Sequence, residues 1–194
     1  MTVKNDLLKA AYIPAIASTL FLIIPLTGML LSAGVNWGLF DFIFAWVIIF
    51  GSGFTYKFIT SKISNTKYKA ALGIAVFTSL FIVWSNLAVG IIGSEDNPVN
   101  LIYFVMLFAV IIGGVVVKFQ PKGLSILMFA AATAHGLIPF AAVLLIGTEN
   151  IERFTREMNV LIGIHLFIIM LWTISGLLFR YSAQDKLKNE EISK

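Results

Sequence analysis

Residues 101–117 read LIYFVMLFAVIIGGVVV, seventeen positions without one charged side chain. About 20 apolar residues in a helix cross the ~30 Å hydrocarbon core of a bilayer, and seventeen is at the short end of the usable range. The sequence changes abruptly on both sides, to GSEDNPVN at residues 93–100 and to KFQPKG at 118–123. This pattern predicts one membrane-crossing helix between two polar turns.

Five other stretches have the same character, at residues 11–32, 38–58, 70–92, 124–146 and 160–179. The first is longer than the apolar core of a signal peptide, so we expect it to stay in the protein as a span. We therefore predict an all-α bundle of six transmembrane helices in three hairpins. It forms a single domain over residues 1–181, followed by a polar, frayed cytoplasmic tail over 182–194.

The composition agrees with this class of protein. Hydrophobic residues make up 59% of the 194 positions and charged residues 12%, against roughly 45–50% and 25% in soluble domains. An ordinary cytosolic enzyme, a disordered chain and a nucleic-acid-binding protein are thereby excluded. The absence of cysteine excludes disulfides, thiolate metal sites and cysteine nucleophiles.

The basic residues predict the orientation in the membrane. All but two of the 14 Lys and Arg residues fall at the termini or in the second and fourth connections, and only Arg153 and Arg156 fall on the opposite side. Positive charge marks the cytoplasmic face. We therefore expect both termini inside, in a multi-pass protein of the inner (plasma) membrane.

The turns between spans have recognisable chemistry. Asn97 and Pro98 are typical of an N-cap followed by a first-turn proline, and Gly93 suits a left-handed position after a helix. Pro121 is expected to stop the fourth span. Asp41, one turn into the second span, is expected to be a helix-start carboxylate at the headgroup level.

His135 is the most informative polar residue, because it falls near the middle of the span 124–146. It lies in AAATAHG, a run of small residues that allows close helix contact. Pro139, four residues further on, cannot donate to the carbonyl of His135. One interpretation is a neutral histidine bonded across helices to a Ser, Thr or Asn; the other is a ligand, cofactor or proton-relay role.

His165 and Asn86 are the other deep candidates. Counted from the outer ends of the predicted spans, the depths of His135 and His165 differ by roughly 9 Å. We therefore expect no metal ion or two-sided haem shared between them, although single axial ligation stays open. Asn86 is interpreted either as a helix–helix hydrogen bond or as one wall of a polar cavity shared with His135.

The aromatic residues divide by depth. We expect an aromatic belt near the span ends, formed by Trp37, Tyr56, Tyr68, Tyr103 and Tyr181. Trp46, Trp84 and Trp172 lie deeper and are expected to pack within the bundle.

Residues 84–104, WSNLAVGIIGSEDNPVNLIYF, resemble a loop of small, uncharacterised bacterial inner-membrane proteins that share the pattern GSEDNPxN. The resemblance implies a bacterial membrane protein with this hairpin, and it carries over no activity. If the loop has a functional role, its candidate residues are Glu95, Asp96, Asn97 and Asn100. Turn formation is the alternative explanation for them.

Three functions remain open. The first is a subunit or accessory component of a membrane assembly, because no catalytic constellation and no metal site are evident. Its partners are the lipid bilayer and either other membrane subunits or a second copy of the chain. The second is a small transporter or channel with a midplane site around His135, Asn86 and Pro139. The third is a haem or other redox protein with His135 or His165 as an axial ligand.

Overall fold

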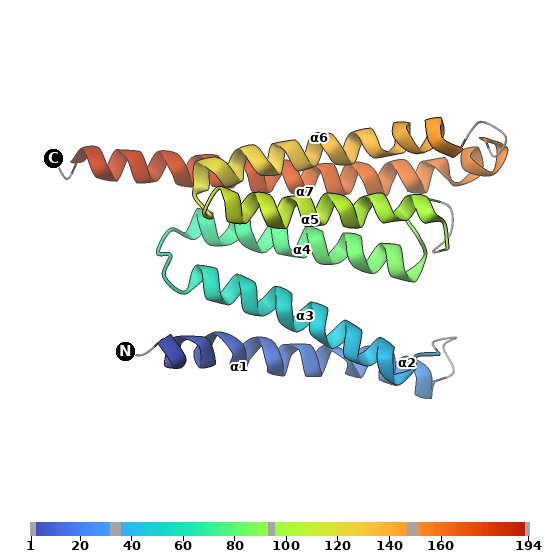
Figure 1. Ribbon diagram of the computed structural model, residues 1–194, viewed down its shortest axis with the longest axis horizontal. Helices are drawn as coiled ribbons and strands as arrows, with labels where there is room; N and C mark the ends of the chain where they lie inside the picture. The colour runs from blue at the N-terminus through green and yellow to red at the C-terminus, as the bar shows by residue number, and fades with distance from the viewer. Residues whose placement is uncertain (1–2, 32–35, 93–95, 147–150, 193–194) are drawn as a thin grey trace. The chain divides into compact units, whose positions relative to one another are not determined.

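The computed structural model describes residues 3–31, 36–92, 96–146 and 151–192, which form helices and turns with no strand among them (Figure 1). The side chains of residues 142–161 lie outside this description. The elements are α1 (Val3–Phe21), α2 (Ile23–Leu30), α3 (Leu39–Thr60), α4 (Thr66–Ala88), the 3-10 turn η1 (Pro98–Asn100), α5 (Leu101–Val116), α6 (Pro121–Ile146) and α7 (Ile151–Ile192). The all-α fold class is confirmed for these residues.

The chain divides into two compact units, Met1–Ser64 and Asn65–Lys194. Each unit is described by itself. The single domain over residues 1–181 stays a prediction.

Among the described residues, five helical segments are long and apolar enough to cross a membrane: Ala10–Leu30, Leu39–Thr60, Thr66–Ala88, Pro98–Val116 and Ile162–Lys188. They correspond to five of the six predicted spans. The remaining span, 124–146, forms the helix α6 but is not one of the five. The count of six crossings and their orientation therefore stay predictions.

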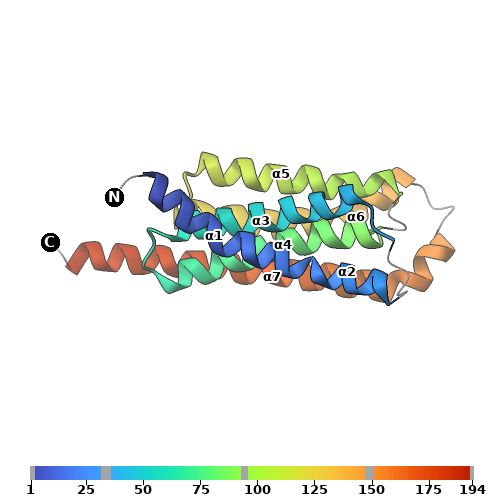
Figure 2. The same cartoon turned by 90° about the horizontal axis from the view of Figure 1, so that it is seen from below.

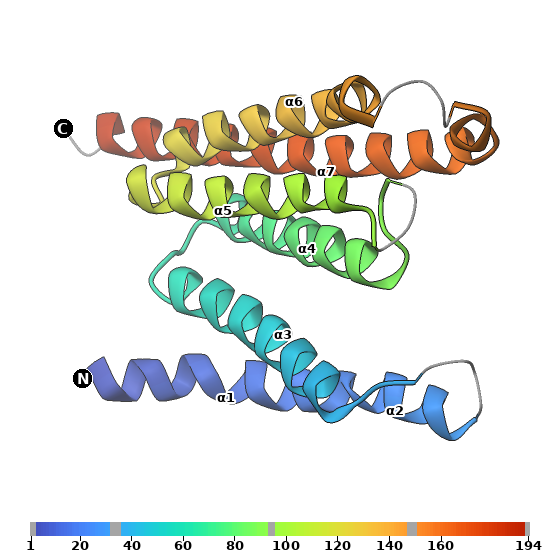
Figure 3. The same cartoon turned by 45° about the vertical axis from the view of Figure 1, so that its right-hand side comes forward.

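In the first unit, α3 packs against α1 and is inclined to it (Figure 3). The contact is close at Gly53, where an added Cβ would lie 3.1 Å from the Cβ of Pro14. The first predicted span is interrupted at Leu22, between α1 and α2. This break lies three residues before Pro25, whose missing N–H removes a helical hydrogen bond.

The second predicted span begins as expected from the sequence. The Oδ2 atom of Asp41 accepts a hydrogen bond of 2.7 Å from the backbone N–H of Gly38, the N-cap of α3. Asp41 is therefore a helix-start carboxylate, as predicted. Its membrane depth stays a prediction.

In the second unit, α7 packs against both α4 and α6, and α5 packs mainly against α6 (Figures 1 and 2). The buried face of α7 repeats at intervals of three and four residues, the spacing of closely packed helices. It consists of His165, Ile168, Trp172, Ser175, Phe179 and Ser182. The contact between α5 and α6 needs a small residue at Gly113, where a Cβ would come within 2.6 Å of Leu127 Cδ1.

The opposite face of α5 is apolar and exposed. Its large exposed side chains are Leu101, Val105, Phe108, Ile111, Ile112, Val115 and Val116, each at least 60% exposed. Soluble monomers rarely expose an apolar stripe of this length, which is typical of a surface that contacts lipid. The outer surface of the unit therefore agrees with a membrane protein.

Two turns differ from their predicted form. Pro121 does not stop the fourth span; it is the first residue of α6, and α5 already ends at Val116. The helix ends there because Lys118 and Phe119 adopt left-handed backbone angles, with φ of 52° and 53°. The hydroxyl of Tyr68 donates a 2.7 Å hydrogen bond to the Phe119 carbonyl and stabilises this turn.

The helix α4 ends at Ala88, four residues before the predicted end of the third span. The left-handed position after it is Gly90, with φ of 72°. Gly93, to which the sequence analysis assigned this conformation, lies outside the described residues. Asn97 accepts a hydrogen bond from the N–H of Val99 and Pro98 follows it, so the predicted N-cap and first-turn proline are confirmed.

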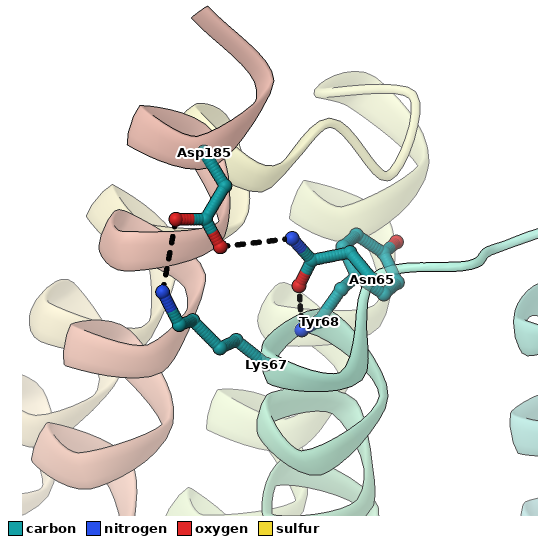
Figure 4. A network of polar contacts seen from close by, with 4 residues as sticks. All are labelled: Asn65, Lys67, Tyr68 and Asp185. Atoms are coloured by element: carbon teal, nitrogen blue, oxygen red, sulfur yellow. Dashed lines mark hydrogen bonds and ion pairs between the residues drawn. The ribbon is translucent and has the colours of Figure 1, made fainter. Parts of the chain in front are cut away.

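Residues 182–192 of the tail are helical and not frayed as predicted, because α7 continues from the candidate span Ile162–Lys188 to Ile192. Its Asp185 forms an ion pair of 2.9 Å with Lys67 and accepts a 3.1 Å hydrogen bond from Asn65 (Figure 4). Asn65 also accepts a hydrogen bond from the N–H of Tyr68 as the N-cap of α4. The tail is therefore bonded to the start of α4. Its polar composition alone does not predict this contact.

From the sequence we also expect the outer loop, residues 147–159, to form a short surface helix with Ile151 and Phe154 facing the membrane. In the structure, residues 151–159 belong instead to the long helix α7, which begins at Ile151. The directions of the Ile151 and Phe154 side chains lie outside the description.

Asn100 is predicted to hold the loop before α5 in place. Its amide accepts from the N–H of Ile92 at 2.9 Å and donates to the carbonyl of Ile92 at 3.2 Å, and it is buried. Asn100→Ala leaves both backbone groups without this partner, at a cost of about 1–3 kcal/mol. The melting temperature in detergent is expected to fall by several degrees. Asp96→Ala, at an exposed position of the same loop, is the control and leaves it unchanged; equal effects of the two variants contradict the assignment.

Candidate functional site

Three ring side chains from three helices meet inside the second unit. Tyr103 of α5, His135 of α6 and His165 of α7 have ring centroids 5.4 Å (Tyr103–His135), 6.1 Å (Tyr103–His165) and 5.0 Å (His135–His165) apart. Their exposed fractions are 0%, 0% and 5%. We call these three residues the histidine–tyrosine cluster.

The predicted separation of the two histidines is wrong. The sequence analysis placed the start of the last span at residue 160, which made His165 shallow. In the structure α7 begins at Ile151, so His165 lies fourteen residues into its helix, while His135 lies eleven residues before the end of α6. The difference of three residues corresponds to about 4.5 Å along a helix. The two side chains extend toward each other, which brings their ring centroids to 5.0 Å.

Tyr103 was not recognised as part of a site. It was assigned to the aromatic belt, as was Tyr68, and both are buried instead. The sequence signal that places Tyr103 on the buried face is its spacing from other buried residues. It lies three residues after Asn100, three before Met106 and four before Leu107, as on one face of a helix. Such spacing is hard to detect in a span where nearly every residue is apolar.

Tyr103 and His165 form a direct hydrogen bond. The Tyr103 hydroxyl oxygen lies 2.8 Å from Nε2 of His165. If the hydroxyl donates the hydrogen bond, Nε2 is unprotonated and the neutral imidazole carries its proton on Nδ1. If Nε2 carries a proton, Nε2 donates the hydrogen bond and the phenol oxygen accepts it. The bond therefore couples the protonation state of His165 to the orientation of a phenol.

His135 has a different environment. Neither its Nδ1 nor its Nε2 has a hydrogen-bond partner among the described residues, although the side chain is fully buried. The predicted bond to a Ser, Thr or Asn of another helix is therefore not found in the described part of the chain. A buried polar group without a partner lowers the stability of the folded state by about 1–3 kcal/mol. Burial of this imidazole is therefore unfavourable by itself and depends on the packing of the side chains around it.

Pro139 lies inside α6, as expected from the sequence. Since proline has no N–H, the helical bond to the carbonyl of His135 cannot form. Both the side chain and the backbone oxygen of His135 are therefore without their ordinary helical or interhelical partners.

Asn86 does not form the predicted bond between helices. Its Nδ2 donates to the carbonyl of Ile82 in its own helix at 2.8 Å, and its buried Oδ1 has no partner among the described residues. Contacts of Phe81 with Phe167 and of Ser175 with the Ala71 carbonyl fix an antiparallel register between α4 and α7. In that register Asn86 lies about one helical turn beyond the level of His165, toward the C-terminal end of α4.

The outer-loop candidates serve the turn. Asn97 caps η1, and Asn100 bonds to Ile92. Asp96 is exposed, and Glu95 lies outside the described residues. The described part of this loop therefore supports turn formation and brings no loop side chain into the histidine–tyrosine cluster.

The donor set is unlike a protein metal centre or a haem clamp. No group of three His, Cys, Asp or Glu side chains able to hold a metal occurs among the described residues. Imidazoles on opposite faces of a haem iron, each bonded at about 2 Å, place their ring centroids about 6 Å apart with the porphyrin between them. Here the centroids are 5.0 Å apart, and a Cβ added at Gly136 of α6 would already lie 3.4 Å from Cδ1 of Ile169 of α7, so a porphyrin does not fit between the two helices.

The buried side chains that the structure describes in this unit carry no fixed charge. The described buried polar residues of this unit are Thr78, Asn86, Asn100, Ser125, His135, His165, Ser175 and Ser182. None is a carboxylate, a lysine or an arginine. Any charge that enters the site therefore has no fixed counter-charge among the buried side chains that the structure describes.

Comparisons of the chain with protein-family models, with curated proteins and with solved structures gave no match.

His135 gives a direct test of whether this cluster is structural. His135→Leu removes two unpaired polar atoms and keeps a side chain of similar size, so we expect the melting temperature in detergent to rise by several degrees, equivalent to about 1–3 kcal/mol. Tyr103→Phe removes the hydroxyl that bonds His165, and we expect the melting temperature to fall. A lower melting temperature for His135→Leu shows instead that this histidine is bonded and stabilises the fold.

Proposed function

We propose that the chain is a bacterial inner-membrane protein with six transmembrane helices and both termini in the cytoplasm. Five candidate spans support this, and α6, with 26 residues, has a length of about 39 Å at 1.5 Å per residue. The distribution of Lys and Arg supports the orientation. The loop resemblance at residues 84–104 supports the bacterial assignment.

Because the chain has no cysteine, single cysteines report its topology directly. Asp96→Cys is expected to react with a membrane-impermeant maleimide added outside intact spheroplasts. Lys122→Cys is expected to react only after the membrane is opened. Labelling of both positions from the same side contradicts six spans with this orientation.

We further propose that the protein is a small transporter or channel, with the histidine–tyrosine cluster as its site. The observation that carries this proposal is the buried His135, with both ring nitrogens unpartnered beside a hydrogen-bonded Tyr103–His165 pair. Ionisable residues at membrane depth commonly mark solute or ion pathways. The absence of fixed charge among the described buried side chains favours a small solute or a single small ion.

The test is solute entry into proteoliposomes that contain the full chain. Swelling in iso-osmotic glycerol, urea, methylammonium chloride and sodium formate is followed by light scattering, alongside proton entry. We expect at least one of these probes to enter faster than in empty liposomes, and His135→Leu to abolish the difference. Equal rates for the protein and for empty liposomes with every probe, protons included, contradict the proposal.

A role as a subunit or accessory component of a membrane assembly is the second candidate. It is favoured by α3, whose spanning window is only 6% buried within the chain and which exposes Leu39, Phe40 and Phe44. Lipid or another subunit would cover this face equally well. Gentle crosslinking in native membranes separates the two, because a lone monomer there contradicts the assembly role.

A further inference from the structure

We propose that the ion handled at the histidine–tyrosine cluster is the proton, and that His135 relays it. This inference rests on the proposed transport function and names its substrate. It uses three observations together: the unpartnered imidazole of His135, the 5.0 Å separation of the two histidine rings, and the hydrogen bond between Tyr103 and His165.

The donor atoms select against other ions. Hard cations such as Na⁺ or Mg²⁺ take several oxygen ligands, usually including carboxylates, whereas the cluster offers imidazole nitrogens and one phenol oxygen. A free anion would meet no lysine or arginine among the described buried side chains of this unit. A divalent transition metal would bring two positive charges to a site with no described buried carboxylate. The proton is the ion that an imidazole binds by itself.

Among the described side chains, the rings that face His135 can take part in proton exchange. Tyr103 faces it from α5 and His165 from α7. The described buried polar side chains of α4, Thr78 and Asn86, do not titrate in the physiological range. Lys67 and Asp185 are exposed at the far end of α4 and α7 and pair with each other.

The relay follows from the two nitrogens of an imidazole. A neutral His135 accepts a proton on its free nitrogen and becomes a cation. It then loses the proton from the other nitrogen, so one proton arrives, one leaves and the ring returns to neutrality in the opposite tautomer. Rotation of the ring then restores the first tautomer, so each cycle moves one proton past His135. Tyr103 holds the ring of His165 in place beside it, since the phenol bonds to Nε2.

Polar groups continue along the buried faces on both sides of the cluster. Asn86, with its unpartnered Oδ1, lies about one turn outward. Inward on α7 follow Trp172, with an unpartnered Nε1, and then Ser175 and Ser182 on the same buried face. Trp172 is seven residues from His165, which is about 10 Å. Its indole N–H donates a hydrogen bond but cannot accept a proton, so a proton moves along this stretch only on bridging water.

The experiment measures proton entry into proteoliposomes of the full chain loaded with a pH-sensitive dye. Valinomycin and an outward potassium gradient make the interior negative and drive protons inward. We expect the wild-type protein to acidify the interior at least about tenfold faster than empty liposomes. His135→Leu is expected to return the rate to background, and Tyr103→Phe to lower it several-fold.

Met128→Leu is the matched control, since Met128 is a buried residue of the same α6 face and the change conserves volume. It is expected to keep the wild-type rate. The expected rise in melting temperature of His135→Leu separates loss of function from loss of folding; if that variant is unstable, His135→Gln replaces it. Wild-type acidification no faster than in empty liposomes, or unchanged by both His135 variants, overturns the relay.

The outcomes also separate this inference from the transport proposal. Entry of glycerol, urea, methylammonium or formate that depends on His135, without proton entry, overturns the proton assignment and leaves the transporter in place. If neither protons nor any of the four solutes enter, both proposals fail. Proton entry alone supports both, because the proton is then the substrate.

Discussion

The buried face of α7 is the constraint on which the second unit depends. It packs against α4 on one side and against α6 on the other, and its residues recur every three or four positions from His165 to Ser182. Serine hydroxyls lock both contacts: Ser175 bonds to the Ala71 carbonyl of α4, and Ser125 of α6 bonds to the Gly176 carbonyl of α7, each at 2.8 Å. Small side chains bring the helices close enough for such bonds, and once these levels are fixed the two histidines must face each other.

A bundle held together by these contacts can keep a buried polar side chain that makes no hydrogen bond of its own. Packing along the rest of the face fixes the helices, so His135 stays buried although neither of its nitrogens has a partner among the described residues. Strain and unpaired polar groups of this kind persist where the surrounding structure over-determines them, and they concentrate at functional sites. Tyr103 and His165, by contrast, satisfy each other. The site therefore combines a hydrogen-bonded pair, Tyr103 and His165, with the imidazole of His135, whose nitrogens are available for proton exchange.

The fold was largely predictable from the sequence, because the length and polarity of the apolar runs determine where helices lie. The details that failed depend on interactions between distant residues. Pro121 opens α6 because left-handed Lys118 and Phe119 end α5 first, and the Tyr68 hydroxyl that stabilises them comes from another helix. The tail continues as a helix with Asp185 bonded to Lys67 and Asn65, 118 and 120 positions away. No local pattern contains such information.

The site shows the same division. His135 and His165 were identifiable as candidates because ionisable residues are costly at membrane depth. Their proximity was missed because it depends on where α7 begins, and the polar segment before residue 160 concealed eight to nine helical residues. An error of that size at one helix start changes a depth by about 13 Å, which is enough to turn two separate histidines into a pair. Tyr103 was missed for a different reason, since an all-apolar span gives no contrast between the face toward lipid and the face toward its neighbours.

Neutrality is what makes the pair chemically selective. In water an imidazole exchanges protons with many partners and shows no preference for a path. Inside a bundle whose described buried side chains carry no fixed charge, a protonated histidine is stabilised only by neighbouring dipoles. A second imidazole 5.0 Å away and the phenol bonded to it place such dipoles beside His135. The cation is then a transient of transport and not a resting state, because nothing in the described site holds it.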